Sequence, residues 1–137
     1  MRSVYIHFPL PSQSAIAGWL DLRAVKVGDN QWKSPSAENP VLYCSIEESY
    51  GDWEPGDLVG LHNVVPAPLG YVAVDVSGRV PGEKEVTEFT IGLLGAVAGT
   101  VATDDYSSHP WTLSEIKGGE PFEGFHFFDY KSIRDYR

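Results

Sequence analysis

The sequence predicts an α+β protein with a ferredoxin-like core, in which a split βαβ pair forms an antiparallel sheet with two helices on one face. Two observations lead to this prediction. Runs that alternate between apolar and polar residues and runs with helical spacing follow each other in the order strand, helix, strand, strand, helix, strand. The chain also has 137 residues, of which 42% are hydrophobic, enough to bury one core. We therefore expect a single domain over residues 1–137.

The first strand and the first helix are marked by a change of period near the N-terminus. Val4, Ile6 and Phe8 alternate with other residues, so they lie on one face of a predicted strand over residues 4–8. Two prolines then stop the strand, and apolar residues at helical spacing predict an amphipathic helix over residues 13–26. The sequence Gly-Asp-Asn that follows closes this helix.

Two more alternating runs predict the middle strands of the sheet. In residues 41–47, the alternation places Leu42, Cys44 and Ile46 on the core side. In residues 71–76, three valines alternate in the same way, and valine is typical of strands. We expect both runs to contribute their apolar face to the same core.

Two helices and a last strand complete the predicted core. Asp57 can cap a short helix over residues 58–65. A longer helix over residues 83–97 begins with glutamates, which are favourable near the positive end of the helix dipole. Residues 100–104 then resemble a short strand. The apolar stripe of the longer helix consists of Val86, Phe89, Leu93 and Val97.

The C-terminal part of the chain is predicted to be an aromatic-rich extension. We place the core in residues 3–105 and the extension in residues 106–137, which carries enough apolar surface to dock on the core. The segment between Asp104 and Trp111 is interpreted as a turn in which Asp and Ser side chains bind backbone groups before the tryptophan anchors the next segment. The apolar residues of the extension are Trp111, Leu113, Ile116, Phe122, Phe125, Phe127 and Phe128.

Acidic residues outnumber basic ones, and this balance excludes one class of partner. Ten Lys and Arg oppose nineteen Asp and Glu, a formal net charge of −9, whereas binding to a phosphate backbone requires neutralising cations. We expect no nucleic-acid partner, and a basic partner fits better. We expect no membrane partner either, because no apolar run approaches roughly 20 residues and no signal-peptide pattern occurs. With one cysteine and hence no intramolecular disulfide, the sequence is typical of a cytoplasmic protein.

The charges are unevenly placed along the chain. No Lys or Arg occurs between Lys33 and Arg79, whereas seven Asp and Glu do. This stretch is either a solvated acidic surface or a docking face for a cationic partner, because clustered like charges steer the encounter with such a partner. Its aromatic residues either anchor the partner or pack on the protein's own body. The candidate partner-binding residues, which we call the acidic interval, are Glu47, Glu48, Tyr50, Asp52, Trp53, Glu54 and Asp57.

A second candidate surface is the face of the sheet turned away from the helices, here called the open face. Alternation places there Tyr5, His7, Tyr43, Ser45, Glu47, Tyr71, Asp75, Ala102 and Asp104. This face is solvated, covered by the C-terminal extension, or used to bind a protein, since tyrosine offers a large contact area at low entropic cost. A weak metal or acid–base site formed by His7, Glu47, Asp75 and Asp104 is the alternative if their strands are neighbours. The residues that we select as this second candidate binding surface are His7, Tyr43, Tyr71, Asp75 and Asp104.

The sequence contains no motif that indicates catalysis or a bound cofactor. It has no His and Cys spacing of a metal site, no Gly-x-Ser-x-Gly and no phosphate-binding glycine loop. Cys44 is predicted to face the core, so it is interpreted as a small core residue rather than an activated thiolate. We therefore expect no catalytic residue, no metal and no cofactor.

Part of the chain resembles a known group of proteins. The sequence VAVDVSGR at residues 72–79, the helix after it, DDY at residues 104–106 and HPWTLSEI at residues 109–116 are similar to segments of small acidic bacterial immunity proteins. These proteins are the antidotes of contact-dependent and polymorphic toxin systems. The resemblance covers about residues 70–130, and its motifs are fold markers that carry no catalytic residue to this chain. The first 65 residues are outside it, so the partner-specific surface stays open.

The resemblance implies a non-enzymatic protein that binds and neutralises a cognate bacterial toxin. The toxins of such systems are often nucleases with basic grooves, and an acidic surface can occupy such a groove in place of phosphate. Two alternatives from other classes remain. One is a small metal-dependent or acid–base enzyme that uses the open face, and the other is a ferredoxin-like regulatory module that forms a homodimer through it.

Overall fold

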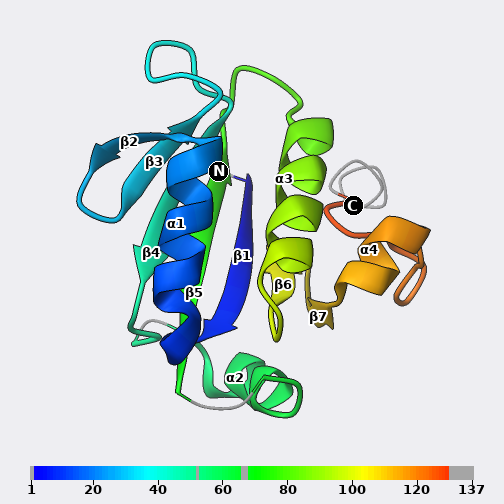
Figure 1. Cartoon of the computed structure of the whole chain (residues 1–137). Coiled ribbons are helices and arrows are strands. Elements are labelled where there is room, and N and C mark those ends of the chain that lie inside the picture. The colour runs from blue at the N-terminus through cyan, green and yellow to red at the C-terminus, as the bar shows by residue number, and fades with distance from the viewer. Residues whose placement is uncertain (1, 52, 66–67, 130–137) are drawn as a thin grey trace.

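The computed structural model describes residues 2–51, 53–65 and 68–129, and one sheet lies at the centre of the molecule (Figure 1). Seven strands form this sheet in the order β2-β3-β4-β5-β1-β6-β7, and each neighbouring pair is antiparallel. The strands are β1 (Arg2–Pro9), β2 (Val25–Gly28), β3 (Gln31–Ser34), β4 (Leu42–Glu47), β5 (Leu69–Val76), β6 (Val101–Asp104) and β7 (Ser107–Trp111). The helices of the described residues are η1 (Leu10–Ser12, a 3-10 turn), α1 (Gln13–Arg23), α2 (Pro55–His62), α3 (Glu83–Ala96) and α4 (Leu113–Gly118).

Helices α1 and α3 lie on one face of the sheet (Figure 1). Ile16 and Leu20 of α1 and Leu93 of α3 are fully buried in the core between the helices and the strands. The two helices also meet directly, because Trp19 and Phe89 form an edge-to-face ring pair at 5.1 Å between centroids. The helical spacing in the sequence therefore predicted both helices and the face that each one buries.

The inward faces of the central strands are those that alternation predicted. Val4 lies opposite Val74 and Ile6 lies opposite Val72 across the β1–β5 pair, so apolar side chains from neighbouring strands stand side by side. The inward apolar side chains of β1, β4 and β5 are each 5% exposed or less. The buried apolar residues of β1, β4 and β5 are Val4, Ile6, Phe8, Leu42, Cys44, Ile46, Val72, Val74 and Val76.

The sheet is larger than the four strands that the sequence predicted. The predicted strands correspond to β4, β5, β1 and β6, which are neighbours in that order, but a hairpin of β2 and β3 extends one side of the sheet. The Gly-Asp-Asn sequence does not close the first helix. It forms the hairpin turn, in which Gly28 pairs with Gln31 and Asn30 has a φ of 57°, a conformation that asparagine tolerates.

The described part of the C-terminal extension continues the fold instead of docking as an appendage. Strand β7 pairs with β6 at the other edge of the sheet, and α4 packs against α3. Trp111, Ile116 and Phe128 are buried in the main core. Asp104 accepts hydrogen bonds from the backbone N–H groups of Tyr106 and Ser107, so the start of the segment predicted as a turn is one. The rest of that segment is strand β7, which the sequence did not predict. The part of the predicted extension beyond residue 129 lies outside the described residues.

The open face is covered at one end, and the segment that covers it was not the one expected. The described residues 48–51 and 53–65, which include α2, lie between β4 and β5 along the chain and contribute to a second, smaller apolar cluster. The C-terminal extension instead joins the core on the side of α1 and α3. The buried residues of the second cluster are Leu61, Val65, Leu69 and Val101.

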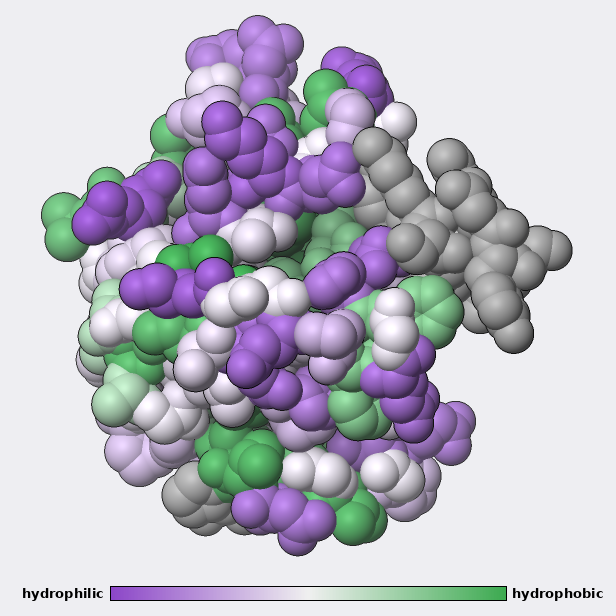
Figure 2. Space-filling view, turned by 90° about the vertical axis from the view of Figure 1, so that its right-hand side faces the viewer, coloured by the Kyte–Doolittle hydropathy of each residue, from purple (hydrophilic) through white to green (hydrophobic). Residues whose placement is uncertain are grey.

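The surface on the side of α4 is mainly hydrophilic, with hydrophobic side chains in small groups (Figure 2). One such group lies at the end of the molecule that carries α2. Separately, Val59 of α2 and Val64 are exposed. Among the described residues, no helix combines the length and the apolar character that a membrane crossing needs.

Candidate functional site

A cleft of about 570 Å³ lies on the open face of the sheet. Three parts of the chain form it: strands β1, β5 and β6, the connection that leads into α2, and the turn between β6 and β7. This position unites part of the acidic interval with part of the open face. The residues that line this acidic cleft are Tyr5, Trp53, Glu54, Asp57, Tyr71, Thr103, Asp104, Asp105, Tyr106, Ser107 and Ser108.

A cluster of aromatic rings forms one side of the cleft. Trp53 lies at its centre, with ring centroids 5.1 Å from Tyr5, 5.2 Å from His7 and 5.3 Å from Tyr71. Tyr50 completes the cluster at 4.8 Å from Tyr71. These distances are typical of favourable ring pairs. Trp53 and Tyr50 therefore pack on the protein's own sheet, and Trp53 lines the cleft at the same time.

His7 lies beneath this cluster and is fully buried. Its Nδ1 is 2.8 Å from the Tyr50 hydroxyl, and its Nε2 is 2.9 Å from the Thr103 hydroxyl. Tyr50 donates its one hydroxyl hydrogen to the Gly70 carbonyl at 3.0 Å, so it accepts from His7 Nδ1–H. Nε2 is then the acceptor of the Thr103 hydroxyl, and both nitrogens of a neutral imidazole are satisfied.

The electrostatic state of this site follows from its burial. Desolvation lowers the pKa of His7 to about 3, because a charged imidazolium is unfavourable in this interior. Burial, followed by the charge of Asp105, raises the pKa of Tyr5 to about 12. Burial likewise raises the pKa of Tyr50. At neutral pH the histidine is therefore uncharged and the two tyrosines keep their hydroxyl hydrogens.

Asp105 ties the turn between β6 and β7 to the first strand. Its Oδ2 accepts the backbone N–H of Ser3 at 2.7 Å, and its Oδ1 accepts the Tyr5 hydroxyl at 3.1 Å. Burial raises the pKa of Asp105, although both hydrogen bonds act in the opposite direction. This carboxylate holds the tyrosine in place and adds negative charge to the cleft.

Asp104 is on the opposite side of β6 from the one expected. It lies across from Val4, and Ala102 lies across from Ile6, so both belong to the helix side of the sheet. The predicted assignment of the residues of β6 to the two faces of the sheet was shifted by one residue, and such a shift exchanges the two faces. The carboxylate of Asp104 accepts backbone N–H groups, among them that of Phe128 at 2.8 Å. Burial nevertheless raises its pKa, and its role is structural.

Glu54 and Asp57 provide the carboxylates on the α2 side of the cleft. Glu54 is exposed and immediately precedes α2, so the helix starts at Pro55 and not after a cap at Asp57. Asp57 lies in the first helical turn, where a negative charge is favourable. Within the described part of the chain, neither carboxylate has a side-chain hydrogen bond or ion pair.

The other predicted residues lie outside the cleft. Glu47 and Glu48 are exposed at the end of β4, and Tyr43 is exposed with the ammonium of Lys33 at 5.5 Å from its ring centroid. Asp75 accepts the Ser3 hydroxyl at 2.5 Å. Asp52 lies outside the described residues.

Several lining residues were not singled out from the sequence. The turn from Asp105 to Ser108 joins the cleft because β6 lies beside β1, and this long-range pairing has no local sequence signal. Thr103 was missed through the shifted alternation of β6. Tyr5 was placed on the open face but was not chosen as a site residue. The paired acids at residues 104–105, followed by tyrosine and serines, were the available signal.

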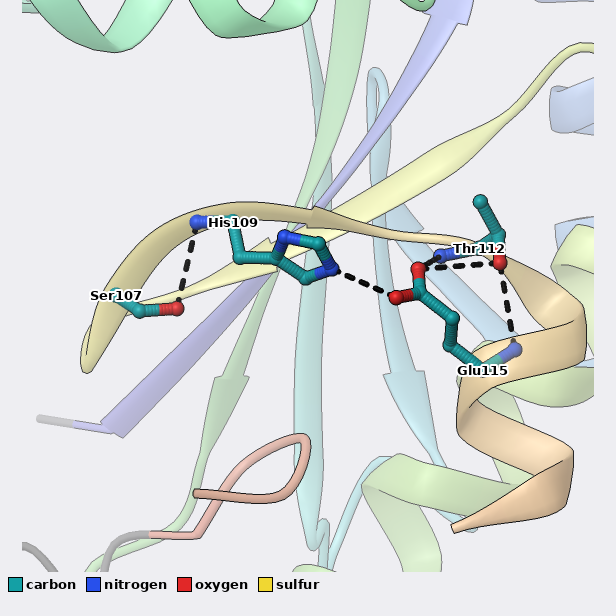
Figure 3. A network of polar contacts seen from close by, with 4 residues as sticks. All are labelled: Ser107, His109, Thr112 and Glu115. Atoms are coloured by element: carbon teal, nitrogen blue, oxygen red, sulfur yellow. Dashed lines mark hydrogen bonds and ion pairs between the residues drawn. The ribbon is translucent and has the colours of Figure 1, made fainter. Parts of the chain in front are cut away.

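A polar network beside the cleft has a structural explanation (Figure 3). His109 Nε2 lies 2.9 Å from Glu115 Oε2, and the two form an ion pair when the imidazole is protonated. Glu115 also accepts the Thr112 backbone N–H at 3.0 Å, and the Thr112 hydroxyl accepts the Glu115 N–H. This is a capping box that starts α4. Burial opposes ionisation of Glu115, but the bonds from Thr112 and His109 lower its pKa.

Comparisons of the chain with protein-family models, with curated proteins and with solved structures gave no match. Within the described residues, no group of three or more His, Cys, Asp and Glu side chains is arranged to hold a metal ion. The arrangement in the cleft, with rings on one side and carboxylates around them, is suited to binding a positively charged group.

Proposed function

We propose that this chain is a non-enzymatic immunity protein that neutralises a cognate bacterial toxin in the cytoplasm by binding a basic surface of it. One observation carries the proposal. The acidic cleft presents the carboxylates of Glu54, Asp57 and Asp105 together with aromatic side chains, and no Lys or Arg of the described chain lines it. A surface of one sign attracts a partner of the opposite sign and repels wrong partners.

The charge of the whole chain supports this proposal. A formal net charge of −9 produces a long-range field that steers a cationic protein to the surface and increases the association rate. If the toxin is a nuclease, its phosphate-binding groove is basic. Carboxylates then occupy the positions that phosphates take in its substrate, and binding blocks the reaction without chemistry by the inhibitor.

We also propose that the core is ferredoxin-like. The adjacent strands β4, β5, β1 and β6 with α1 and α3 on one face have the order of a split βαβ pair. The β2–β3 hairpin and β7 are then additions at the two sides of this core. The immunity-protein resemblance over residues 70–130 is independent of this argument.

The state of His7 favours binding over acid–base catalysis. A general base must reach its substrate and titrate near the working pH, whereas His7 is fully buried, engages both ring nitrogens and has a pKa of about 3. The imidazole therefore supports the packing of Trp53 and Tyr50. The proposal assigns recognition to the side chains above it.

The proposal is tested with the toxin itself. The partner is identified by mass spectrometry of basic proteins that co-purify from the native host and by the reading frame next to this gene. Binding and protection of toxin-expressing cells are then measured for Trp53→Ala, Glu54→Lys and Asp57→Lys. We expect each variant to bind more weakly, while the same charge reversal at exposed Glu120, outside the cleft, leaves binding unchanged. Parent-like protection by all three variants would place the interface elsewhere.

A further inference from the structure

We propose that the acidic cleft receives an arginine side chain of the partner protein, with the guanidinium group among the rings and carboxylates of the cleft. This inference rests on the proposed function, because it names the chemical group by which the toxin is held.

The aromatic side of the cleft is suited to a flat cation. Trp53, Tyr5 and Tyr71 are each only partly buried, and the structure places all three along the cleft. A cation over such a ring is attracted by the negative face of the π system, and a guanidinium also stacks on it. The chain makes this contact elsewhere, since the guanidinium of Arg23 lies 5.8 Å from the ring centroid of Trp19.

The carboxylates of the cleft are arranged around these rings on more than one side. Glu54 and Asp57 come from the start of α2, whereas Asp105 comes from the turn between β6 and β7. A guanidinium presents five N–H donors in one plane, so it can bind carboxylates on two sides and a ring face at once. An ammonium group lacks this planar geometry.

A metal ion fits the same residues less well. Asp105 uses one oxygen for the Ser3 N–H and the other for the Tyr5 hydroxyl, and Asp104 uses both for backbone N–H groups. A hard cation needs several carboxylate oxygens that converge on one point. No such group occurs among the described residues.

The size of the cleft is sufficient for an arginine side chain of a larger molecule. Its volume of about 570 Å³ is in the range of sites that hold small molecules, roughly 300–1,000 Å³. This is enough for a side chain together with the backbone that carries it. An arginine on an exposed loop of the toxin meets this description.

The first experiment uses the full-length protein labelled with ¹⁵N and two matched probes. Capped arginine (N-acetyl-arginine amide) carries the guanidinium, and capped citrulline has the same shape without the charge. We expect arginine to shift the indole N–H signal of Trp53 in a saturable manner in NMR titrations and citrulline to shift it far less. The signal is assigned by its loss in Trp53→Phe. Equal effects of the two probes, or an unshifted Trp53 signal, would overturn the inference.

A pair of double variants tests the carboxylates. Glu54→Gln/Asp57→Asn removes two negative charges from the cleft, and Glu47→Gln/Glu48→Gln removes two from the nearby exposed end of β4. We expect the first to weaken arginine binding by about tenfold and the second to leave it nearly unchanged. Equal losses would mean that only the general charge of the protein acts, and would overturn the inference. The same spectra report whether each variant is folded.

These measurements separate the inference from the proposed function. If the toxin binds the protein while the cleft does not distinguish arginine from citrulline, the function holds and the inference fails. If the cleft binds arginine through Glu54 and Asp57 while the protein binds no toxin, the cleft chemistry holds and the proposed function fails.

Discussion

At the scale of single residues, His7 shows how a buried neutral group links the cleft to the core. The imidazole touches the rings of Tyr50 and Trp53 on one side and the hydroxyl of Thr103 on the other. Its protonation would place an uncompensated charge beneath the aromatic cluster. The integrity of the cleft therefore depends on this histidine remaining neutral.

This state predicts a specific pH dependence of stability. The unfolded chain binds a proton at His7 below its ordinary pKa of 6.5, whereas the folded chain does so only near pH 3. The free energy of unfolding should therefore fall as the pH decreases from about 6.5 to 3, by at most about 1.4 kcal/mol per pH unit. Chemical denaturation across this range measures the slope.

The raised pKa values of Asp104 and Asp105 act in the opposite direction, because the folded state then gains protons before the unfolded state does. His7→Gln isolates the histidine. The difference in unfolding free energy between wild type and this variant should shrink as the pH falls. The same substitution at exposed His62 serves as the control, and a constant difference at His7 would contradict the prediction.

Cys44 is a second residue whose chemistry follows from burial. It is 3% exposed on β4, and burial, with a smaller effect of Asp75, raises the pKa of its thiol to about 12. The thiolate is the reactive form, so we expect native protein at pH 8 to resist iodoacetamide. Intact mass should show one added group only after unfolding in denaturant. Rapid labelling of the native protein would contradict this expectation.

At the scale of elements, the entry into α3 depends on a glycine. Gly82 precedes the helix with a φ of 69°, and a Cβ built there would lie 2.3 Å from Val76 Cγ1. We expect Gly82→Ala to lower the free energy of unfolding by at least about 1–2 kcal/mol, because the left-handed conformation and the clash both disfavour a side chain. Thermal and chemical denaturation measure this loss.

Gly78 supplies the matched control for this prediction. It lies in the same β5–α3 connection, has no atom within 4 Å of a built Cβ, and its φ is outside the left-handed region. Gly78→Ala should therefore change stability little. Similar losses for the two variants would mean that the helix entry tolerates a side chain and that Val76 does not constrain it.

The elements that the sequence predicted with both nearly correct bounds and the correct face are those with a long buried face, whereas β6 was predicted with its faces exchanged and α2 with a start three residues late. β1, β4, β5, α1 and α3 each carry several core residues at a regular period, so their type and orientation could be derived locally. The β2–β3 hairpin was missed because β2 is short and its Val25 and Val27 are exposed. The start of α4 was available from the capping box and was overlooked.

The candidate site was predictable only in part, because some of its residues are brought together by pairing between strands that are distant in the sequence. Trp53, Glu54 and Asp57 were identified from charge and composition, and Tyr71 from alternation. Their meeting with Asp105 depends on β6 pairing with β1, a contact between residues about 100 positions apart. No local pattern encodes that pairing, and the one-residue error in β6 moved Asp104 to the wrong face.

At the scale of the whole molecule, the charge predicts how association responds to salt. Between low salt and 0.15 M, the Debye length falls to about 8 Å, so the steering by a net charge of −9 is reduced. The association rate with a cationic toxin should fall over this range, while the dissociation rate changes much less. Stopped-flow or surface-binding kinetics measure both. A salt-independent association rate would contradict a basic partner.

The connection over residues 48–65 has a consequence for how this fold diversifies. It carries one wall of the cleft and packs through the second apolar cluster, which it shares with Leu69 of β5 and Val101 of β6, whereas the main core lies between the sheet and α1 and α3. Substitutions on the outer side of this connection can change which partner is accepted without repacking the central strands. Under the proposed function, partner recognition and folding can therefore be selected separately, so that related chains could adapt to new toxins on an unchanged scaffold.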